Sequence, residues 1–382
     1  MPLEETPSFP EPVPEPEPVT EHEYEHEQAQ NPTPVSVAVS VPKPVIPVSH
    51  DLPHRIPNDE PRAVSIPGVK ARFAFATFLS GSEKEYPYEI DTYFIATRLL
   101  VWQLLHSKET KSQNYTVPVI VIVAERVPEH QRQRLRKDGA VVVQVPSLSA
   151  SWTKAGWSGW DSVLTKLRLF EFTDFERIAF LDVDTVLSKP IDDVFDDPAV
   201  EERYNLRNIH MNIPGAIDAP DTYVFAGNAE SAHGHEFPPT QEGRDWPNPR
   251  YLNAGFFVIK PDVEMLKYYL SVLEMPDSFD SKLPEQNLMN AIHRRDGNMP
   301  WQQVNTIYNI HYPNMTDVQK GVKSVHEKWW IMGKDVGKLR FWMQARRWQM
   351  EGYYEALDEL EAQAAEQKKA QAESIRMESD FA

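Results

Sequence analysis

The stretch RIAFLDVDTVLSKPIDDVFD, from Arg177 to Asp196, places two carboxylates one residue apart at the end of an apolar run. The run has the length of a buried strand, and Asp182 and Asp184 come at its carboxyl end. Residues i and i+2 of an extended chain point the same way, so both carboxylates can face one point in space. A divalent cation relieves the repulsion between such carboxylates, and hard oxygen ligands suit Mg²⁺ or Mn²⁺. Taken alone, the pair also fits a solvated acidic turn.

Strand and helix patterns alternate on the N-terminal side of this stretch. Apolar runs of strand length occupy 71–79, 117–125 and 140–145, and the segments 90–106 and 128–139 carry helical spacing or helix start and stop residues. This alternation predicts an α/β fold with a mostly parallel, doubly wound sheet that is covered on both faces. Such a sheet binds its ligand at the carboxyl ends of the strands, which is where the two aspartates fall.

The composition changes along the chain. About half of the 33 prolines precede residue 70, and the first Lys or Arg is Lys43. Low hydrophobicity, abundant proline and charge of one sign predict a disordered, partly polyproline-II tail over 1–68. We expect one catalytic domain over 69–335 and a helical extension over 336–382. The start of this extension mixes tryptophan with arginine and is expected to pack across the catalytic domain, with a membrane surface as the alternative; its last part is expected to be a solvated helix.

Charge and cysteine content narrow the classes of partner. The net charge of −18 argues against nucleic acid, because phosphate neutralisation needs a surplus of Lys and Arg. The absence of cysteine excludes disulfides, thiolate metal sites and a cysteine nucleophile, and it fits a reducing compartment. No segment reaches the ~18 uninterrupted apolar residues of a transmembrane helix. We therefore expect a cytoplasmic protein, with peripheral association with the Golgi as the alternative and a homodimer as a compatible state.

Four further observations form an ordered set of motifs. They are the segments LTKLRLFEFTDFERIAFLDVDTVLSKPIDDVFD (164–196), YLNAGFFVIKPD (251–262), PEQNLMNAI (284–292) and VKSVHEKWW (322–330). In this order and spacing the chain resembles glycosyltransferase family eight, the glycogenin and galactinol synthase group, over about residues 71–332. The resemblance implies a single GT-A catalytic domain with a Rossmann-like sheet. It also implies retaining transfer of a hexose from a UDP-sugar to an acceptor hydroxyl, with Mn²⁺ or Mg²⁺ as cofactor.

The resemblance implies a metal site made of Asp182, Asp184 and His326, with Val183 contacting the donor between the two acids. Breaking a glycosyl–phosphate bond leaves a diphosphate with extra negative charge, and a bound cation stabilises that leaving group. Neutral imidazole is an ordinary third ligand for Mn²⁺. Outside such a set of motifs, a lone histidine in a polar loop would be read as a surface residue.

The resemblance also implies residues that bind the donor sugar and the nucleotide. Glu285 and Gln286 open a helix after Pro284, and the family places an acid and a glutamine there against sugar hydroxyls near the reacting carbon. Helix capping is the plainer interpretation of the acid, and this chain has Glu where the family usually has Asp. The resemblance implies that Glu285, Gln286 and Lys166 act in catalysis. The remaining implied donor contacts are Lys166 again, Thr77, Tyr93, Asn253 and Lys328.

Some of these assignments have alternatives. Tyr93 opens a helix and can stack on the nucleotide base, but an aromatic residue there is more often a packing residue. The family commonly places several residues between the late histidine and the following lysine, whereas HEKWW has only one. This departure puts the role of Lys328 in doubt, and Lys334 is the fallback.

The sequence leaves the donor sugar open between glucose, galactose and N-acetylglucosamine, and the acceptor open between a carbohydrate, polyol, lipid or protein. The departing phosphate oxygen is the favoured proton acceptor, with Asp280 or Glu285 as a nucleophile in the alternative double displacement. A glycogenin-like enzyme would modify its own tyrosine, and Tyr308 and Tyr312 lie in the right region. The rival function is a catalytically degenerate transferase that serves as a binding or scaffold protein.

Overall fold

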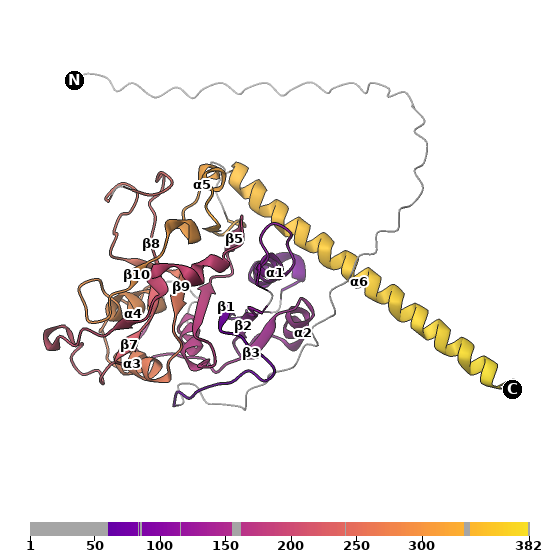
Figure 1. Cartoon of the computed structure of the whole chain (residues 1–382), viewed down its shortest axis with the longest axis horizontal. Helices are drawn as coiled ribbons and strands as arrows, with labels where there is room; N and C mark the ends of the chain where they lie inside the picture. The colour runs from indigo at the N-terminus through magenta and orange to yellow at the C-terminus, as the bar shows by residue number, and fades with distance from the viewer. Residues whose placement is uncertain are drawn as a thin grey trace, which may run out of the picture. The chain divides into compact units, whose positions relative to one another are not determined.

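Seven strands form the central sheet (Figure 1). The computed structural model describes residues 60–380 except 83, 85, 115, 155–161, 241 and 332–336, so most of the predicted tail lies outside the described residues. The strand order is β10-β8-β9-β4-β1-β2-β3. The strands are β1 (Phe73–Leu79), β2 (Val119–Val123), β3 (Val141–Gln144), β4 (Arg177–Leu181), β8 (Phe225–Ala229), β9 (Leu252–Ile259) and β10 (Gln302–Gln303).

One strand of this sheet runs against the other six. β1 pairs in parallel with β2 and β4, β2 with β3, and β10 with β8. β9 is antiparallel to both of its neighbours, β4 and β8. The prediction of a mostly parallel α/β sheet of the GT-A type is therefore confirmed. Because β9 is reversed, its first residues lie beside the last residues of β4.

Helices cover both faces of the sheet. Ile120 and Val121 are successive residues of β2 and point to opposite faces. Val121 shares a core with Leu100 of α1, and Ile120 shares the other core with Leu266 of α3 and Leu288 of α4. The α-helices are α1 (Thr92–Leu105), α2 (Glu129–Lys137), α3 (Val263–Leu273), α4 (Pro284–Ile292), α5 (Met315–Lys320) and α6 (Gly337–Asp380).

Shorter elements connect these layers. The segment around Lys166 is a 3₁₀ helix. A three-stranded sheet joins β11 (Ile310–His311), β12 (Ser324–His326) and β5 (Thr185–Leu187), and β6 (Arg203–Tyr204) pairs with β7 (Thr222–Tyr223). The 3₁₀ helices are η1 (Tyr88–Ile90), η2 (Val163–Glu171), η3 (Asp192–Asp196), η4 (Pro198–Val200), η5 (Ile209–Met211) and η6 (Thr306–Tyr308).

The long helix α6 packs through its first half only. Leu339, Met343, Met350 and Tyr354 are buried, whereas the described side chains from Glu359 onward are exposed. The start of this extension thus packs on the domain, and its end is a solvated helix. Both findings agree with the prediction from the sequence. Within the described ranges, no helix is both long and apolar enough to cross a membrane.

A buried polar network joins α6 to α1 and to the loop that follows β1. Arg98 of α1 donates to Asp138 at 2.6 Å and to the Tyr88 hydroxyl at 2.7 Å. Tyr88 in turn donates to Glu351 of α6 at 2.6 Å, and the Tyr354 hydroxyl donates to the carbonyl of Asp138 at 3.3 Å. The side chains of Arg98 and Asp138 are 7% and 0% exposed, so this ion pair is shielded from solvent. The helix is therefore held by specific polar contacts as well as by apolar burial.

The predicted boundary of the tail at residue 68 lies too far along the chain, because part of the segment 60–68 packs on the domain. Val64 and Ile66 are buried in the core beside η2. The Val64 amide donates to the carbonyl of Glu171 at 2.7 Å. A compositional prediction averages over a long window, and it therefore missed two apolar residues that find a place on the domain.

Burial of Ile66 predicts a stability effect within the assigned tail. Replacing Ile66 with Ala removes buried apolar volume and should lower the free energy of unfolding by about 2 kcal/mol or more. Ile90 is 59% exposed, so Ile90→Ala is the matched control and should change it by less than about 0.5 kcal/mol. Urea unfolding followed by circular dichroism measures both variants. Equal midpoints for Ile66→Ala and the wild type would show that this segment does not contribute to the core.

Candidate active site

A tight turn connects β4 to β5 and carries both aspartates. β4 ends at Leu181 and β5 begins at Thr185, whose amide donates to the carbonyl of Asp182 at 3.1 Å. The Asp182 amide donates to the carbonyl of Gly255 in β9 at 2.8 Å. The two acids therefore lie in a turn and not in the extended strand that the i, i+2 argument assumed. They still converge, because the turn and the neighbouring strand hold them on one side.

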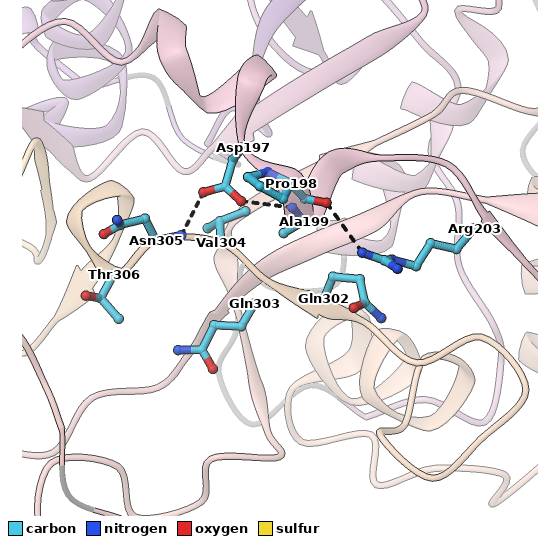
Figure 2. A pocket seen from close by; sticks show the side chains of 9 residues that line it. All are labelled: Asp197, Pro198, Ala199, Arg203, Gln302, Gln303, Val304, Asn305 and Thr306. Carbon is cyan, nitrogen blue, oxygen red and sulfur yellow. Dashed lines mark hydrogen bonds between the residues drawn. The ribbon is translucent and has the colours of Figure 1, made fainter.

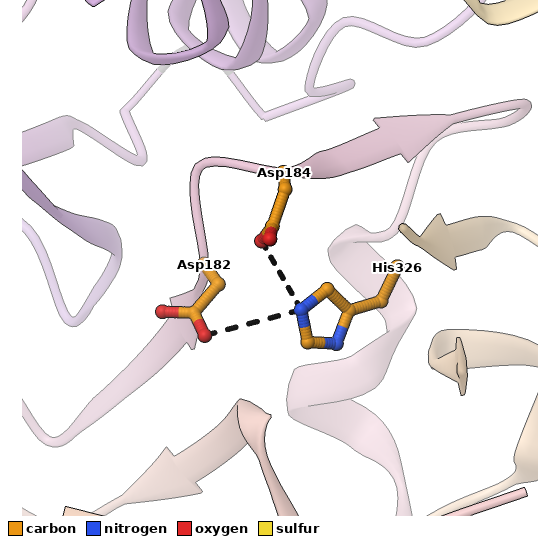
Figure 3. A group of neighbouring side chains, drawn as sticks. All are labelled: Asp182, Asp184 and His326. Atoms are coloured by element: carbon orange, nitrogen blue, oxygen red, sulfur yellow. Dashed lines mark ion pairs between the residues drawn. The ribbon is translucent and has the colours of Figure 1, made fainter. Parts of the chain in front are cut away.

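His326 reaches the two aspartates through the small sheet. In the antiparallel pair of β12 and β5, His326 stands opposite Thr185, next to the turn. Its Nε2 lies 3.1 Å from Asp184 Oδ1 and 3.9 Å from Asp182 Oδ2 (Figure 3). One ligand atom from each of the three residues lies within 4.8 Å of the others. The three residues that the sequence grouped as a metal site are thus brought together.

Asn253 orients the imidazole of His326. The Nδ1 atom of His326 lies 3.1 Å from Asn253 Oδ1, which also accepts from the Gly255 amide at 3.1 Å. An amide oxygen can only accept, so Nδ1 carries a proton and Nε2 is the nitrogen that faces the carboxylates. Burial alone would lower the pKa of His326, but Asp184 and Asp182 outweigh burial and raise that pKa above its ordinary value. Nε2 is therefore the nitrogen that could bind a metal ion after it releases its proton. Asn253 was predicted to contact the donor, and the contact seen in the structure is with His326.

Each of the two aspartates forms an ion pair with a lysine. Lys166 of η2 lies 2.7 Å from Asp182 Oδ1 and 3.1 Å from Glu285 Oε1. Lys328 lies 2.8 Å from Asp184 Oδ2. Each aspartate therefore gives one oxygen to a lysine and turns the other toward His326.

These contacts set the charge of the site. Burial alone would lower the pKa of Lys166, but Asp182 and Glu285 outweigh burial and raise that pKa above its ordinary value. Burial alone would raise the pKa of Asp184, but His326 and Lys328 hold it well below its usual range. Lys166 is thus a cation and Asp184 an anion in a buried setting. Each buried carboxylate is paired with a lysine, and such pairing is what allows charges to be buried away from water.

The donor set fits a hard divalent cation. Two ligands about 2.1 Å from one ion, at right angles, lie about 3.0 Å apart, and the Asp184–His326 distance of 3.1 Å matches this separation. Carboxylate oxygen with imidazole nitrogen is a donor set that Mn²⁺ accepts. Gly255 adds a steric requirement, because a Cβ at this position would overlap the ring of His326. The residues present therefore fit the cofactor that the resemblance implies.

Comparison with known proteins gives the chain its family. No family model matches it. It is 30% identical over 280 residues to an uncharacterised protein of Schizosaccharomyces pombe, covering 68% of this chain and 72% of that protein. It is 26% identical over 235 residues to galactinol synthase 5 of Arabidopsis thaliana (60% and 63% covered) and 22% identical over 303 residues to galactinol synthase 10 of the same species (73% and 81%). The chain belongs to glycosyltransferase family eight.

Solved structures show likeness at a lower level. Galactosyltransferase LgtC, in complex with donor and acceptor sugar analogues, matches with a TM-score of 0.43 at 13% identity. The match covers 73% of this chain and 95% of that chain.

The other residues predicted to contact the donor in this family-eight protein differ in their burial and contacts. Val183 is buried between the aspartates. Tyr93 is 46% exposed, and its ring lies edge-on to that of Trp330 at 5.3 Å between centroids. Partial burial raises the pKa of the Tyr93 hydroxyl. Lys328 acts to lower this pKa, and Asp184 acts to raise it. Thr77 is fully buried in β1, and its hydroxyl has no hydrogen-bond partner among the described residues. Lys334, the fallback for Lys328, lies outside the described residues.

Gln286 joins α4 to the start of β9. Its Oε1 accepts from the Ala254 amide at 2.8 Å and its Nε2 donates to the Tyr251 hydroxyl at 3.0 Å. Glu285, its neighbour, is the residue that Lys166 shares with Asp182. Glu285 is therefore connected to Asp182 through Lys166, and Gln286 lies against the start of β9. The roles of both residues toward a donor sugar stay predictions.

The sequence missed a second group of side chains beside His326. Glu230 directly follows β8, and His311 ends β11 directly opposite His326 of β12. Glu230 Oε1 and His311 Nδ1 are 3.2 Å apart, and this contact with His311 lowers the pKa of Glu230. No motif marks either residue, because their contact joins segments that are distant in sequence. Only the order of the strands could have revealed it.

A cavity elsewhere on the chain contains none of these residues. It measures about 600 Å³ and lies at the β10 edge of the sheet (Figure 2). Asp197, at its rim, accepts from the amides of Asn305 and Ala199 at 2.9 Å each. Asp197 thus joins η4 to the segment that follows β10.

The close fit of His326 over Gly255 predicts a selective loss of metal binding. Gly255→Ala would displace the imidazole and should weaken Mn²⁺ binding at least tenfold, as measured by isothermal titration calorimetry. Gly227→Ala is the matched control, because its Cβ would meet Leu252 and Phe256 in the same strand pair but not His326. It should lower the melting temperature while leaving the Mn²⁺ affinity unchanged. Equal Mn²⁺ affinity in Gly255→Ala and the wild type would contradict the assignment of His326 as a ligand.

Proposed function

We propose that this chain is a retaining glycosyltransferase that moves a hexose from a UDP-sugar to an acceptor hydroxyl with a divalent cation. Membership of family eight supports the class of reaction. The observation that carries the proposal is the meeting of Asp182, Asp184 and His326, with one lysine on each carboxylate. A solvated acidic turn would have no need of a buried histidine whose Nε2 faces both carboxylates.

Asp182, Asp184 and His326 would hold the cation, as Mn²⁺ or Mg²⁺. The cation supplies positive charge to the diphosphate as it leaves. Lys328 is suited to bind a phosphate oxygen as a point charge, because its side chain is 29% exposed while its position is set by Asp184. Lys166, at 6% exposed, instead keeps Asp182 and Glu285 in place. The charges are thus arranged before the substrate arrives, so little reorganisation is needed in the transition state.

The bond changes of this proposal balance without a protein nucleophile. The bond between the anomeric carbon and the phosphate oxygen breaks, the acceptor oxygen attacks from the same face, and its proton moves to the departing phosphate oxygen. Glu285 is a poor nucleophile because its carboxylate is paired with Lys166. Asp280 accepts a hydrogen bond from the amide of Lys282 at 3.0 Å, which fits a turn-forming role. These contacts favour front-face attack over the double displacement.

An external acceptor is favoured over self-modification. A glycogenin-like reaction needs a tyrosine hydroxyl that can reach the donor. Tyr308 is only 4% exposed, and its ring lies under Lys323 and stacks with Phe256. Tyr312 is half-buried, and its ring lies against that of His311. Of the two tyrosines, Tyr312 is therefore the one beside the site.

Asp184→Asn tests the proposal directly. The change keeps the shape of the side chain but removes the charge that faces His326 and Lys328, so Mn²⁺-dependent UDP release should fall about 10²-fold or more. The melting temperature should fall modestly, because Asp184 is paired with Lys328 and does not mainly repel Asp182. Asp193→Asn removes an Asp–Lys pair with Lys323 outside the site and should leave turnover unchanged. UDP release is measured on all three proteins with UDP-glucose, UDP-galactose and UDP-N-acetylglucosamine.

Two results would contradict the proposal in different ways. Unchanged, Mn²⁺-dependent turnover in Asp184→Asn would remove the aspartate pair from the metal site. Tight UDP binding by the wild type without UDP release from any of the three donors would instead identify a degenerate transferase that acts as a binding protein.

A further inference from the structure

The cavity at the edge of the central sheet lies apart from the metal site (Figure 2). β10 is the outermost strand of the sheet, and the cavity of about 600 Å³ is lined by β10, the residues that follow it, η4 and Arg203. In the parallel pair of β10 and β8, Gln303 lies opposite Gly227, three residues before Glu230. At about 3.3 Å per residue, the cavity is therefore roughly 10 Å back along the sheet from the residues beside His326.

Each amide side chain in the cavity uses only one of its two ends within the described part of the chain. Gln302 Nε2 donates to the carbonyl of Pro300 at 2.8 Å, which leaves Oε1 able to accept. Gln303 Oε1 accepts from Arg295 at 3.3 Å, which leaves Nε2 able to donate. Asn305 Oδ1 accepts from the backbone amide two residues further on at 3.1 Å, which leaves its amide nitrogen as a second donor. The cavity therefore offers unused donors and an unused acceptor.

Water reaches these unused groups. None of the three, nor the Thr306 hydroxyl, is among the buried polar atoms that lack a partner in the described residues. Together they present donors and acceptors close to one another on a concave surface. A sugar hydroxyl both donates and accepts hydrogen bonds, so a mixed lining of amides and a hydroxyl suits it.

The two charged groups of the cavity offset each other. Asp197 uses both of its oxygens, because Oδ1 accepts from the Ala199 amide and Oδ2 from the Asn305 amide. Arg203 donates to the carbonyl of Pro198 at 3.4 Å, and within the described ranges it forms no ion pair with a carboxylate. One anion and one cation give the cavity no net charge, which favours a neutral ligand over a phosphate or another ion. The exposed ring of Pro198 adds an apolar surface.

We propose that this cavity is a second carbohydrate site, separate from the metal site, and that its ligand is a neutral oligosaccharide. Ring hydroxyls pair with the unused ends of Gln302, Gln303 and Thr306, and a C–H face of a sugar lies on Pro198. An extended peptide fits less well, because β10 is only two residues long and offers few main-chain groups to an added strand. The inference goes beyond the proposed function, since binding here needs neither the cation nor a sugar donor.

The position of this site gives it an anchoring role. A ligand at the β10 edge leaves the metal site open, because the cavity includes none of the residues proposed to hold the cation. A chain of linked sugars bound about 10 Å from the metal site is also kept at a high effective concentration there.

Direct binding tests the second carbohydrate site without turnover. Saturation-transfer NMR is recorded on the full chain in EDTA, with maltohexaose, cellohexaose and mannohexaose as probes and glycerol as the small polyol control. We expect transfer to at least one hexasaccharide and none to glycerol. The signal should be at least about fivefold weaker in Gln303→Leu and in Thr306→Val, because each variant loses one of a few hydrogen bonds.

Gln349→Leu is the matched control for these variants. Gln349 lies on α6 and, like Gln303, accepts a hydrogen bond from an arginine, Arg346, at 3.0 Å. This variant should bind as the wild type does, and all three variants should keep the wild-type melting temperature. Transfer to none of the three hexasaccharides, or equal transfer in all variants, would overturn the inference.

The metal-site variant separates this inference from the proposed function. Asp184→Asn should bind the hexasaccharide as the wild type does, and Gln303→Leu should keep Mn²⁺-dependent UDP release at the wild-type level. Hexasaccharide binding that depends on Gln303, in a protein that never releases UDP, would support the second site and remove the transferase activity. Loss of binding in Asp184→Asn would place the glycan at the metal site and overturn the second site.

A peptide ligand is the remaining outcome of the same measurement. A blocked hexapeptide of alternating Thr and Val is recorded beside the sugars. Transfer to this peptide and to no hexasaccharide would identify β10 as an edge for strand addition, and the carbohydrate assignment would then be wrong.

Discussion

Antiparallel pairing between β4 and β9 is the constraint on which the site depends. Because β9 runs against its neighbours, its first residues lie beside the end of β4, and the Asp182 amide donates to Gly255 at 2.8 Å. The same strand carries Asn253, which accepts a hydrogen bond from Nδ1 of His326, and Gly255, whose missing side chain makes room for that ring. A parallel β9 would place both residues at the opposite end of the sheet.

Charge pairing explains how three carboxylates and two lysines can share a poorly solvated region. Lys166 lies between Asp182 and Glu285, and Lys328 lies on Asp184, so every ion has a partner within 3.1 Å. The lysines also direct the second oxygen of each aspartate toward His326. Stability and function are therefore served by the same contacts: the pairs that reduce the cost of burial also shape the ligand set.

Contacts far from the metal site support the segments that surround it. The loop between β1 and α1, which leads to Tyr93, is tied to α6 through Tyr88 and Glu351, and Arg98 joins that pair to the buried Asp138. α6 is thus part of the support for one side of the site. In its exposed second half, Glu361 pairs with Lys137 of α2 at 2.9 Å, and because both side chains are solvent-exposed this ion pair contributes little to stability.

The sheet, its helices and the Asp-x-Asp pair were predictable from the sequence, because strand and helix periodicities are local and a buried strand must end where Asp182 begins. The set of ordered motifs likewise pointed to the family. Tertiary structure alone decided that Lys328 meets Asp184 despite the short spacing in HEKWW, and that Glu230 meets His311. Such contacts depend on which strands become neighbours and in which direction they run. Strand order is a property of the whole packed chain and leaves no local pattern to read.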